Sequence, residues 1–175
     1  MTYRLVRALS RLLLWLFYCR VDVIGRERIP RSGGVVVAAN HHNSVVDAML
    51  VVAVFPRPVT VLANAPLFRH PLMGPFLRMM GAVPVQRRAE AGDDPRKNDA
   101  MFASAIGALG RGGAILIFPE GRTQPQPVLL PLRTGAARMV LGAAGAPEAA
   151  EPVTLLPVGI VFHDPGTFRA ARCRS

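Results

Sequence analysis

The fold is decided by residues 34–54, which read GVVVAANHHNSVVDAMLVVAV. The first part is a run of small and β-branched apolar residues without the polar alternation of a strand that faces water on one side. A polar segment from Asn40 to Asp47 follows, and the apolar run from Val46 to Val54 has the length of a short helix. This order predicts a strand covered on both faces, a polar loop at its carboxyl end, and a helix.

The same alternation continues on both sides of this stretch. Further strands are expected at Val21 to Ile24, Val59 to Ala63, Ala114 to Phe118 and Val153 to Phe162, and further helices at 99–109 and 135–142. Three prolines between residues 65 and 80 must break any helix there, and segments 87–98 and 145–152 read as loops. A chain of 175 residues is long enough for one domain with a core. We predict a single α/β domain with a central, mostly parallel sheet flanked by helices.

The N-terminal segment, residues 3–18, reads as an amphipathic helix. Arginines 4, 7 and 11 share one face, and leucines 5, 9, 12, 13 and 16 crowd the other. Two interpretations have equal weight: the helix lies at a membrane interface with its arginines near lipid phosphates, or it packs on the core. The apolar run from Leu12 to Cys19 is well below the roughly 20 residues that a bilayer crossing needs.

Composition restricts the class of partner. The formal net charge of +10 favours an anionic bilayer, a phosphorylated substrate or nucleic acid. The arginines do not cluster with interleaved aromatic residues, so nucleic acid is not an expected partner. Cys19 and Cys173 have neither metal-site nor disulfide-framework spacing, which fits a reducing cytosolic setting. The sequence carries no prediction of oligomeric state.

The polar loop holds the first candidate site, because His41 or His42 can pair with Asp47. A carboxylate that orients an imidazole makes it a general base near neutral pH. On spacing alone, a helix cap and a surface side chain are the more common explanation of such residues. A metal site is not expected, since adjacent histidines point in different directions and no cysteine or glutamate cluster completes the set.

Three further blocks follow along the chain. Residues 81–88 read as a short strand that ends in Arg87 and Arg88, a candidate phosphate clamp. Residues 118–123 form a Pro-Gly turn that aims Glu120 and Arg122 into the space above the strand ends. The glycines before this block are not followed by Gly-Lys-Ser/Thr, so no nucleotide P-loop is present. Residues 155–159 carry a proline inside a strand, which is tolerated mainly at a sheet edge.

In this order the four blocks resemble the phospholipid and glycerol phosphate acyltransferase family, over most of the chain from Asn40 to Val158. The resemblance implies transfer of a fatty acyl group to a hydroxyl of glycerol 3-phosphate or 1-acylglycerol 3-phosphate (lysophosphatidate) in phospholipid synthesis. The donor is acyl-CoA or acyl carrier protein, with no resident cofactor and no metal. Residues 1–20 are then an interfacial helix and residues 21–175 the acyltransferase domain, on the cytoplasmic side of the cell membrane as a peripheral or monotopic protein.

The resemblance also assigns roles to residues. His41 or His42 is the general base and Asp47 its orienting partner. Arg87 and Arg122 hold the acceptor phosphate, while Glu120 and Gly121 organise the acceptor pocket. The usual four-residue gap between His and Asp selects His42, and the usual Asn-His pair selects His41, which we favour. Backbone N–H groups near Gly121 or in residues 157–159 are candidates for stabilising the oxyanion.

Two departures from the family pattern and three alternatives remain. Asn64 stands where relatives often have lysine, and relatives usually continue into another strand and helix, so a C-terminal truncation is left open. The chain is alternatively an inactive protein with the acyltransferase fold, or an enzyme acting on a lysolipid without phosphate. A serine hydrolase using Ser44 is the third alternative, although the Gly-x-Ser-x-Gly elbow is missing from the sequence.

Overall fold

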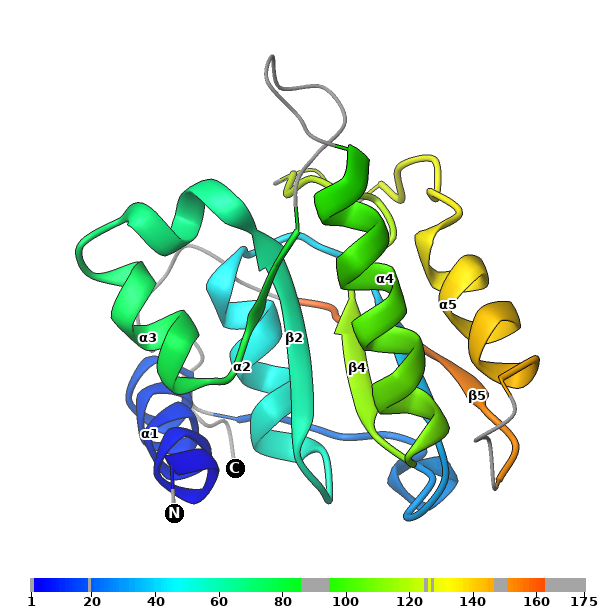
Figure 1. Ribbon diagram of the computed structural model, residues 1–175. Coiled ribbons are helices and arrows are strands. Elements are labelled where there is room, and N and C mark those ends of the chain that lie inside the picture. The colour runs from blue at the N-terminus through cyan, green and yellow to red at the C-terminus, as the bar shows by residue number, and fades with distance from the viewer. Residues whose placement is uncertain are drawn as a thin grey trace.

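The computed structural model describes residues 2–18, 20–85, 95–124, 126, 128–146 and 151–162. They form a five-stranded sheet in the order β3-β2-β4-β1-β5, in which every pair is parallel. The strands are β1 (Val35–Ala39), β2 (Val59–Asn64), β3 (Val83–Val85), β4 (Ala114–Ile117) and β5 (Thr154–Val158). The predicted single α/β domain with a parallel sheet is confirmed (Figure 1).

The described residues also form five α-helices and two short 3-10 helices, of which α1 and η1 precede the first strand. They are α1 (Thr2–Phe17), α2 (Val45–Val54), α3 (Met73–Met79), α4 (Pro95–Gly110), α5 (Gly135–Ala144), η1 (Arg26–Arg28) and η2 (Ala65–Arg69). The break between η2 and α3 confirms the interruption predicted for residues 65–80. The predicted loop over 87–98 is wrong in its last part, because α4 begins at Pro95 and proline fits the first position of a helix.

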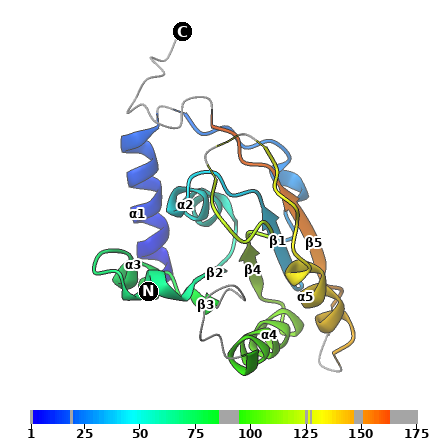
Figure 2. The same ribbon diagram turned by 90° about the horizontal axis from the view of Figure 1, so that it is seen from above.

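The helices cover both faces of the sheet, as Figure 2 shows. Val35 and Val37 of β1 lie in one cluster with Val52 of α2, and Val36 lies in a second cluster with Leu109 of α4. Helices α1 and α3 adjoin the first layer, and α5 completes the second (Figure 2). A strand that is buried on both faces needs the continuous apolar run seen in its sequence.

Two strand predictions need correction. Residues 21–24 form no strand: Ile24 is 98% exposed, and no described strand pairs with the segment. β-Branched residues favour extended backbone, but a strand also needs a neighbour, and the chain turns away at Gly25 with φ 75°. The last strand ends at Val158 instead of Phe162. There the side chain of Asn40 exchanges two hydrogen bonds with the backbone of Ile160, at 2.8 and 2.6 Å.

Proline is accommodated in β5 as predicted, since β5 is an edge strand of the sheet and its free side needs no N–H donor.

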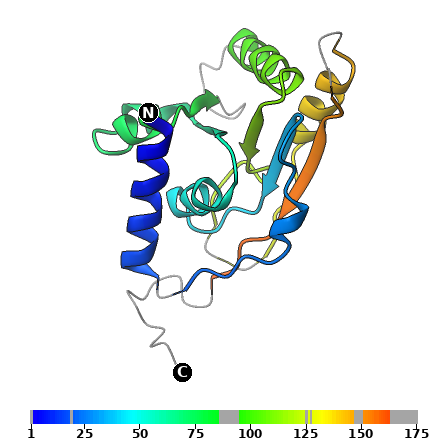
Figure 3. The same ribbon diagram turned by 90° about the horizontal axis from the view of Figure 1, so that it is seen from below.

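Helix α1 confirms the predicted helical segment and lies beside α2 (Figure 3). Val6, Ser10 and Leu14 are buried on its inner side. Arg7 and Arg11 donate through Nε to the carbonyl of Ala53, at 3.4 and 3.1 Å. They therefore provide donors for one of the last carbonyls of α2, where positive charge also interacts favourably with the negative end of the helix dipole. None of the described helices combines the length and hydropathy that crossing a membrane requires.

Candidate active site

A tight turn connects β1 to α2 and brings the polar segment together. The backbone N–H of Val46 donates to the carbonyl of Asn43 at 3.0 Å, which closes a four-residue turn. Ser44, its second residue, has φ 46° and ψ −116°, close to the first central position of a type II′ turn. That conformation normally needs glycine, and Ser44 is the one non-glycine residue with positive φ in the described ranges. The turn reverses the chain so that Asp47 returns to His41.

The pair predicted from the sequence is formed by His41. Its Nδ1 lies 2.9 Å from Oδ2 of Asp47, and the same oxygen accepts the backbone N–H of Asn43 at 2.8 Å. Asp47 is fully buried, and its Oδ1 has no hydrogen-bond partner among the described residues. A carboxylate only accepts, so Nδ1 of His41 carries the proton and Nε2 of the neutral ring is left as the basic nitrogen.

Glu120 holds the backbone of the histidine loop from the neighbouring strand. Its Oε1 accepts the backbone N–H of His41 at 2.9 Å, and Oε2 accepts that of Leu130 at 3.1 Å. Glu120 is 3% exposed and does not line the cavity described below. A buried carboxylate needs such donors to offset its lost hydration. Glu120 therefore joins three segments at the carboxyl ends of β1 and β4.

Two more contacts fix the imidazole of His41. Its ring stacks on Phe118, with centroids 3.9 Å apart and an angle of 16° between the planes. The backbone carbonyl of His41 accepts the N–H of Gln124 at 3.1 Å, which also holds the main chain at this residue. The ring thus has a neighbour on one face and a carboxylate at Nδ1, which leaves little freedom of rotation.

His42 makes a different contact and is not paired with Asp47. Its Nδ1 lies 3.3 Å from the carbonyl oxygen of Gln124, and the residue is not part of the cavity wall. Of the two candidate bases, the structure thus brings only His41 to the carboxylate.

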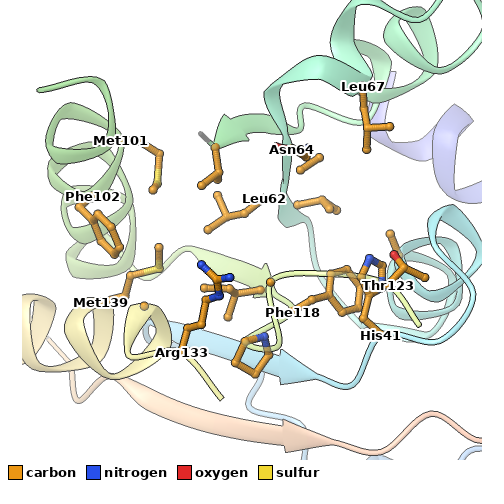
Figure 4. A pocket seen from close by; sticks show the side chains of 18 of the residues that line it. His41, Leu62, Asn64, Leu67, Met101, Phe102, Phe118, Thr123, Arg133 and Met139 are labelled. Carbon is orange, nitrogen blue, oxygen red and sulfur yellow. The ribbon is translucent and has the colours of Figure 1, made fainter. Parts of the chain in front are cut away.

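A cavity of about 810 Å3 lies over the sheet between α2, α4 and α5, with His41 in its wall (Figure 4). Most of the other wall residues are apolar; those that come from β2, β4, α4 and α5 include Leu62, Met101, Phe102, Ile117 and Met139. Asn64 also lines it, so the position where the family often has lysine contributes a neutral amide.

The remaining predicted site residues lie in different places. Gly121 lines the cavity with φ 71°, but its backbone N–H donates to the carbonyl of Phe118 at 3.0 Å and is not available to an oxyanion. Arg122 is exposed and is absent from the cavity wall, whereas Gly121 and Thr123 on either side of it are present. Arg87 and Arg88 lie outside the described residues.

Tyr18 extends the site toward the N-terminal helix. Its hydroxyl accepts a hydrogen bond from Nδ2 of Asn43 at 3.1 Å. Burial raises the pKa of the Tyr18 phenol and the negative charge of Asp47 raises it further, while the bond from Asn43 acts in the opposite direction. The end of α1 therefore contacts the same turn that carries the histidine.

Sequence reasoning missed Tyr18, the stacking of Phe118 on His41, and Arg133, whose side chain projects into the cavity in Figure 4. Arg133 follows the Pro-Glu-Gly turn by a dozen residues, and its backbone N–H donates to the carbonyl of Pro119 at 2.8 Å. Its position, two residues before the glycine that starts α5, is a weak signal without the fold.

Comparison with known proteins agrees with this architecture. The model of the Acyltransferase family matches residues 20–161. A 1-acyl-sn-glycerol-3-phosphate acyltransferase from Borreliella burgdorferi is 31% identical over 69% of this chain and 46% of its own length. One from Bacillus subtilis is 30% identical over 66% of this chain and 54% of its own. The chain thus spans about half the length of these curated relatives.

A solved structure shares the fold. The crystal structure of the 1-acyl-sn-glycerophosphate (LPA) acyltransferase from Thermotoga maritima superposes with a TM-score of 0.62, at 22% identity, over 89% of this chain and 55% of that one. The family match covers most of the chain, including His41, Asp47, Glu120 and Arg133. The chain therefore belongs to the Acyltransferase family.

Proposed function

We propose that this protein transfers a fatty acyl group from a thioester to the hydroxyl of a glycerol phosphate or lysophospholipid, as the names of its relatives suggest. The observation that carries the proposal is the pair of His41 and buried Asp47, 2.9 Å apart, in the wall of a largely apolar cavity. Few other reactions need a general base beside a surface that accepts an alkyl chain.

In the proposed reaction, Nε2 of His41 takes the proton of the acceptor hydroxyl while the oxygen attacks the thioester carbonyl. Asp47 keeps the proton on Nδ1 and stabilises the imidazolium that forms. The tetrahedral intermediate then expels the thiolate, which receives the proton from His41. The products are an ester and a free thiol, and every proton is accounted for without a covalent acyl-enzyme.

The other residues support this step by position. Glu120 fixes the His41 backbone, and Phe118 restricts the ring. The roles of Arg87 and Arg122 in holding the acceptor phosphate remain part of the proposal from family resemblance. The acyl donor is proposed to be acyl-CoA or acyl carrier protein, bound as a co-substrate with no resident cofactor or metal.

We further propose that the enzyme works on the cytoplasmic side of the cell membrane, bound by α1. Leu5, Leu12 and Trp15 of this helix are between 51% and 64% exposed, and Arg4 is exposed beside them. Apolar side chains next to arginine suit an anionic lipid interface. Lysophospholipid acceptors reside in such an interface.

The test is release of free thiol from acyl-CoA in the presence of glycerol 3-phosphate, 1-acylglycerol 3-phosphate or 1-acylglycerol, with acyl carrier protein as the second donor. Release that depends on an acceptor is expected. Loss of a general base reduces rates by about 10²- to 10⁴-fold, so His41→Ala should lose at least this much and His42→Ala far less. A larger loss in His42→Ala contradicts the assignment, and acceptor-independent release contradicts the function.

One alternative has a specific observation in its favour, because Ser44 lines the same cavity as His41. No hydrogen bond joins the Ser44 hydroxyl to a described residue, including His41. If the protein is a serine hydrolase, Ser44→Ala removes activity and acyl groups appear as free acid. If it is a transferase of the proposed kind, Ser44→Ala remains active and the acyl group appears on the acceptor.

A further inference from the structure

Two guanidinium groups belong to the described part of the cavity wall, and they differ in what they contact. Arg138 lies 4.0 Å from Oδ1 of Asp99, and its Cζ lies 4.2 Å from the ring centre of Phe102. Arg133 makes no ion pair and no side-chain hydrogen bond with any residue in the described ranges. Its donors are therefore available to a ligand in the cavity.

The position of Arg133 is set by the Pro-Glu-Gly turn. Its backbone N–H donates to the carbonyl of Pro119 at 2.8 Å. Its side chain packs on Gly121, where an added Cβ would lie 2.8 Å from Nε. Gly121 is thus required for a second reason besides its φ of 71°, because any side chain there would displace the guanidinium. Figure 4 shows Arg133 extending into the cavity from the wall that also carries Phe118.

The same turn links Arg133 to the base. Glu120, the neighbour of Gly121, accepts the backbone N–H of His41 at 2.9 Å. His41 and Arg133 consequently lie in one cavity and are held by adjacent residues of one turn. In a glycerol phosphate the reacting hydroxyl and the phosphate are separated by only a few bonds. A guanidinium mounted on this turn suits a phosphate whose hydroxyl is at His41.

We propose that Arg133 binds the phosphate of the acceptor, a phosphate monoester, within the cavity. The guanidinium is a planar fork whose paired N–H groups match two phosphate oxygens. Arg122, by contrast, is exposed and is not part of the wall. This inference rests on the proposed function for the identity of the acceptor. Coenzyme A and the carrier-protein prosthetic group also carry phosphate, so the experiment must separate the two sources.

The first experiment compares substrates with and without phosphate in Arg133→Gln. Hydrogen bonds to charged groups contribute about 1.5–3 kcal/mol, so KM for 1-acylglycerol 3-phosphate should rise about 10- to 100-fold. KM for 1-acylglycerol should stay within about threefold. KM for acyl-CoA should also stay unchanged, as should KM for the acyl thioester of N-acetylcysteamine, a donor without phosphate. The proposal is overturned if only KM for acyl-CoA rises, or if KM rises equally for 1-acylglycerol 3-phosphate and 1-acylglycerol.

Control variants separate charge from general damage. Arg31→Gln removes an exposed arginine that is not in the cavity wall and should leave every KM unchanged. In the wild-type background, Gly121→Ala should cause the same loss of phosphate preference as Arg133→Gln. In an Arg133→Ala background its further effect on phosphate preference should be much smaller, because the group it displaces is gone, while the backbone strain at φ 71° is common to both backgrounds. Additive effects, or loss of phosphate preference in Arg122→Gln but not in Arg133→Gln, contradict the assignment.

A binding measurement keeps this inference distinct from the proposed function. Glycerol 3-phosphate at millimolar concentration should raise the Tm of the wild type and should raise that of Arg133→Gln less, with glycerol as the neutral comparison. If the wild type transfers no acyl group but binds glycerol 3-phosphate through Arg133, the proposed function fails and the phosphate site stands. Equal Tm shifts in wild type and Arg133→Gln overturn the site.

Discussion

Replacing Ser44 by glycine should stabilise the protein, because the native backbone at this residue is unfavourable for any side chain. The angles φ 46° and ψ −116° place Ser44 in a region that is normally reserved for glycine. A strained residue of this kind costs about 1–3 kcal/mol. Glycine loses about 0.4–1 kcal/mol more conformational entropy on folding than a residue with a Cβ. The net gain should therefore be about 1 kcal/mol.

The side chain itself should matter little. Ser44 is exposed, and its hydroxyl makes no capping hydrogen bond with α2. Urea unfolding followed by circular dichroism measures the free energy of unfolding directly, provided that the m-value is unchanged. For a chain of this size, a gain of about 1 kcal/mol corresponds to a rise in Tm of about 2–4 °C.

A series at one position isolates the backbone effect. Ser44→Ala keeps the Cβ and should stay within about 0.5 kcal/mol of the wild type. Ser44→Val adds branching at positive φ and should be less stable than Ser44→Ala. The expected order of stability is glycine, then serine and alanine together, then valine. If glycine is no more stable than alanine, the turn is not strained and the reasoning is wrong.

Three further outcomes are expected. Glu120→Gln leaves one of two buried N–H donors without an acceptor and should cost about 1–3 kcal/mol in urea unfolding, whereas exposed Glu27→Gln should change stability by less than about 0.5 kcal/mol. Because the pKa of Tyr18 is raised in the folded state, its contribution to stability is fully present below about pH 10 and is lost at higher pH, where the unfolded phenol ionises first. The stability of Tyr18→Phe should therefore decline less steeply with alkaline pH than that of the wild type, and parallel curves contradict this. Leu12→Gln should weaken co-sedimentation with anionic vesicles. Leu141→Gln makes the same change at a residue of α5 that is 73% exposed, and it should not weaken co-sedimentation.

The sheet could be predicted because its strands carry their own signal. Val35 to Ala39 is apolar without alternation, and this pattern in a short run rich in β-branched residues is typical of a strand covered on both faces. The segment from Val21 to Ile24 has similar residues but no partner, and pairing is a tertiary property that propensity does not contain.

The candidate site could be predicted in part. Spacing alone allowed His41 or His42 to pair with Asp47, and the choice depends on the turn at Ser44, a residue that does not normally signal this turn type. Arg133 lies far along the chain from His41, and only the fold brings both to one cavity. Arg122 was expected there because of its motif, but a turn residue can point to either side.

The contacts of α1 have a consequence for the geometry of α2. Arg7 and Arg11 hold its final turn through Ala53, while Tyr18 holds the Asn43 amide just before its start. For a helix of this length the two sets of contacts are about 15 Å apart. Because α2 is held near both ends, its orientation as well as its position is fixed. Removing residues 2–18 would free α2 to tilt, and with it the carboxylate that positions the imidazole. The N-terminal helix thus supports the position of the His41–Asp47 pair, in addition to the lipid contact that we propose for it.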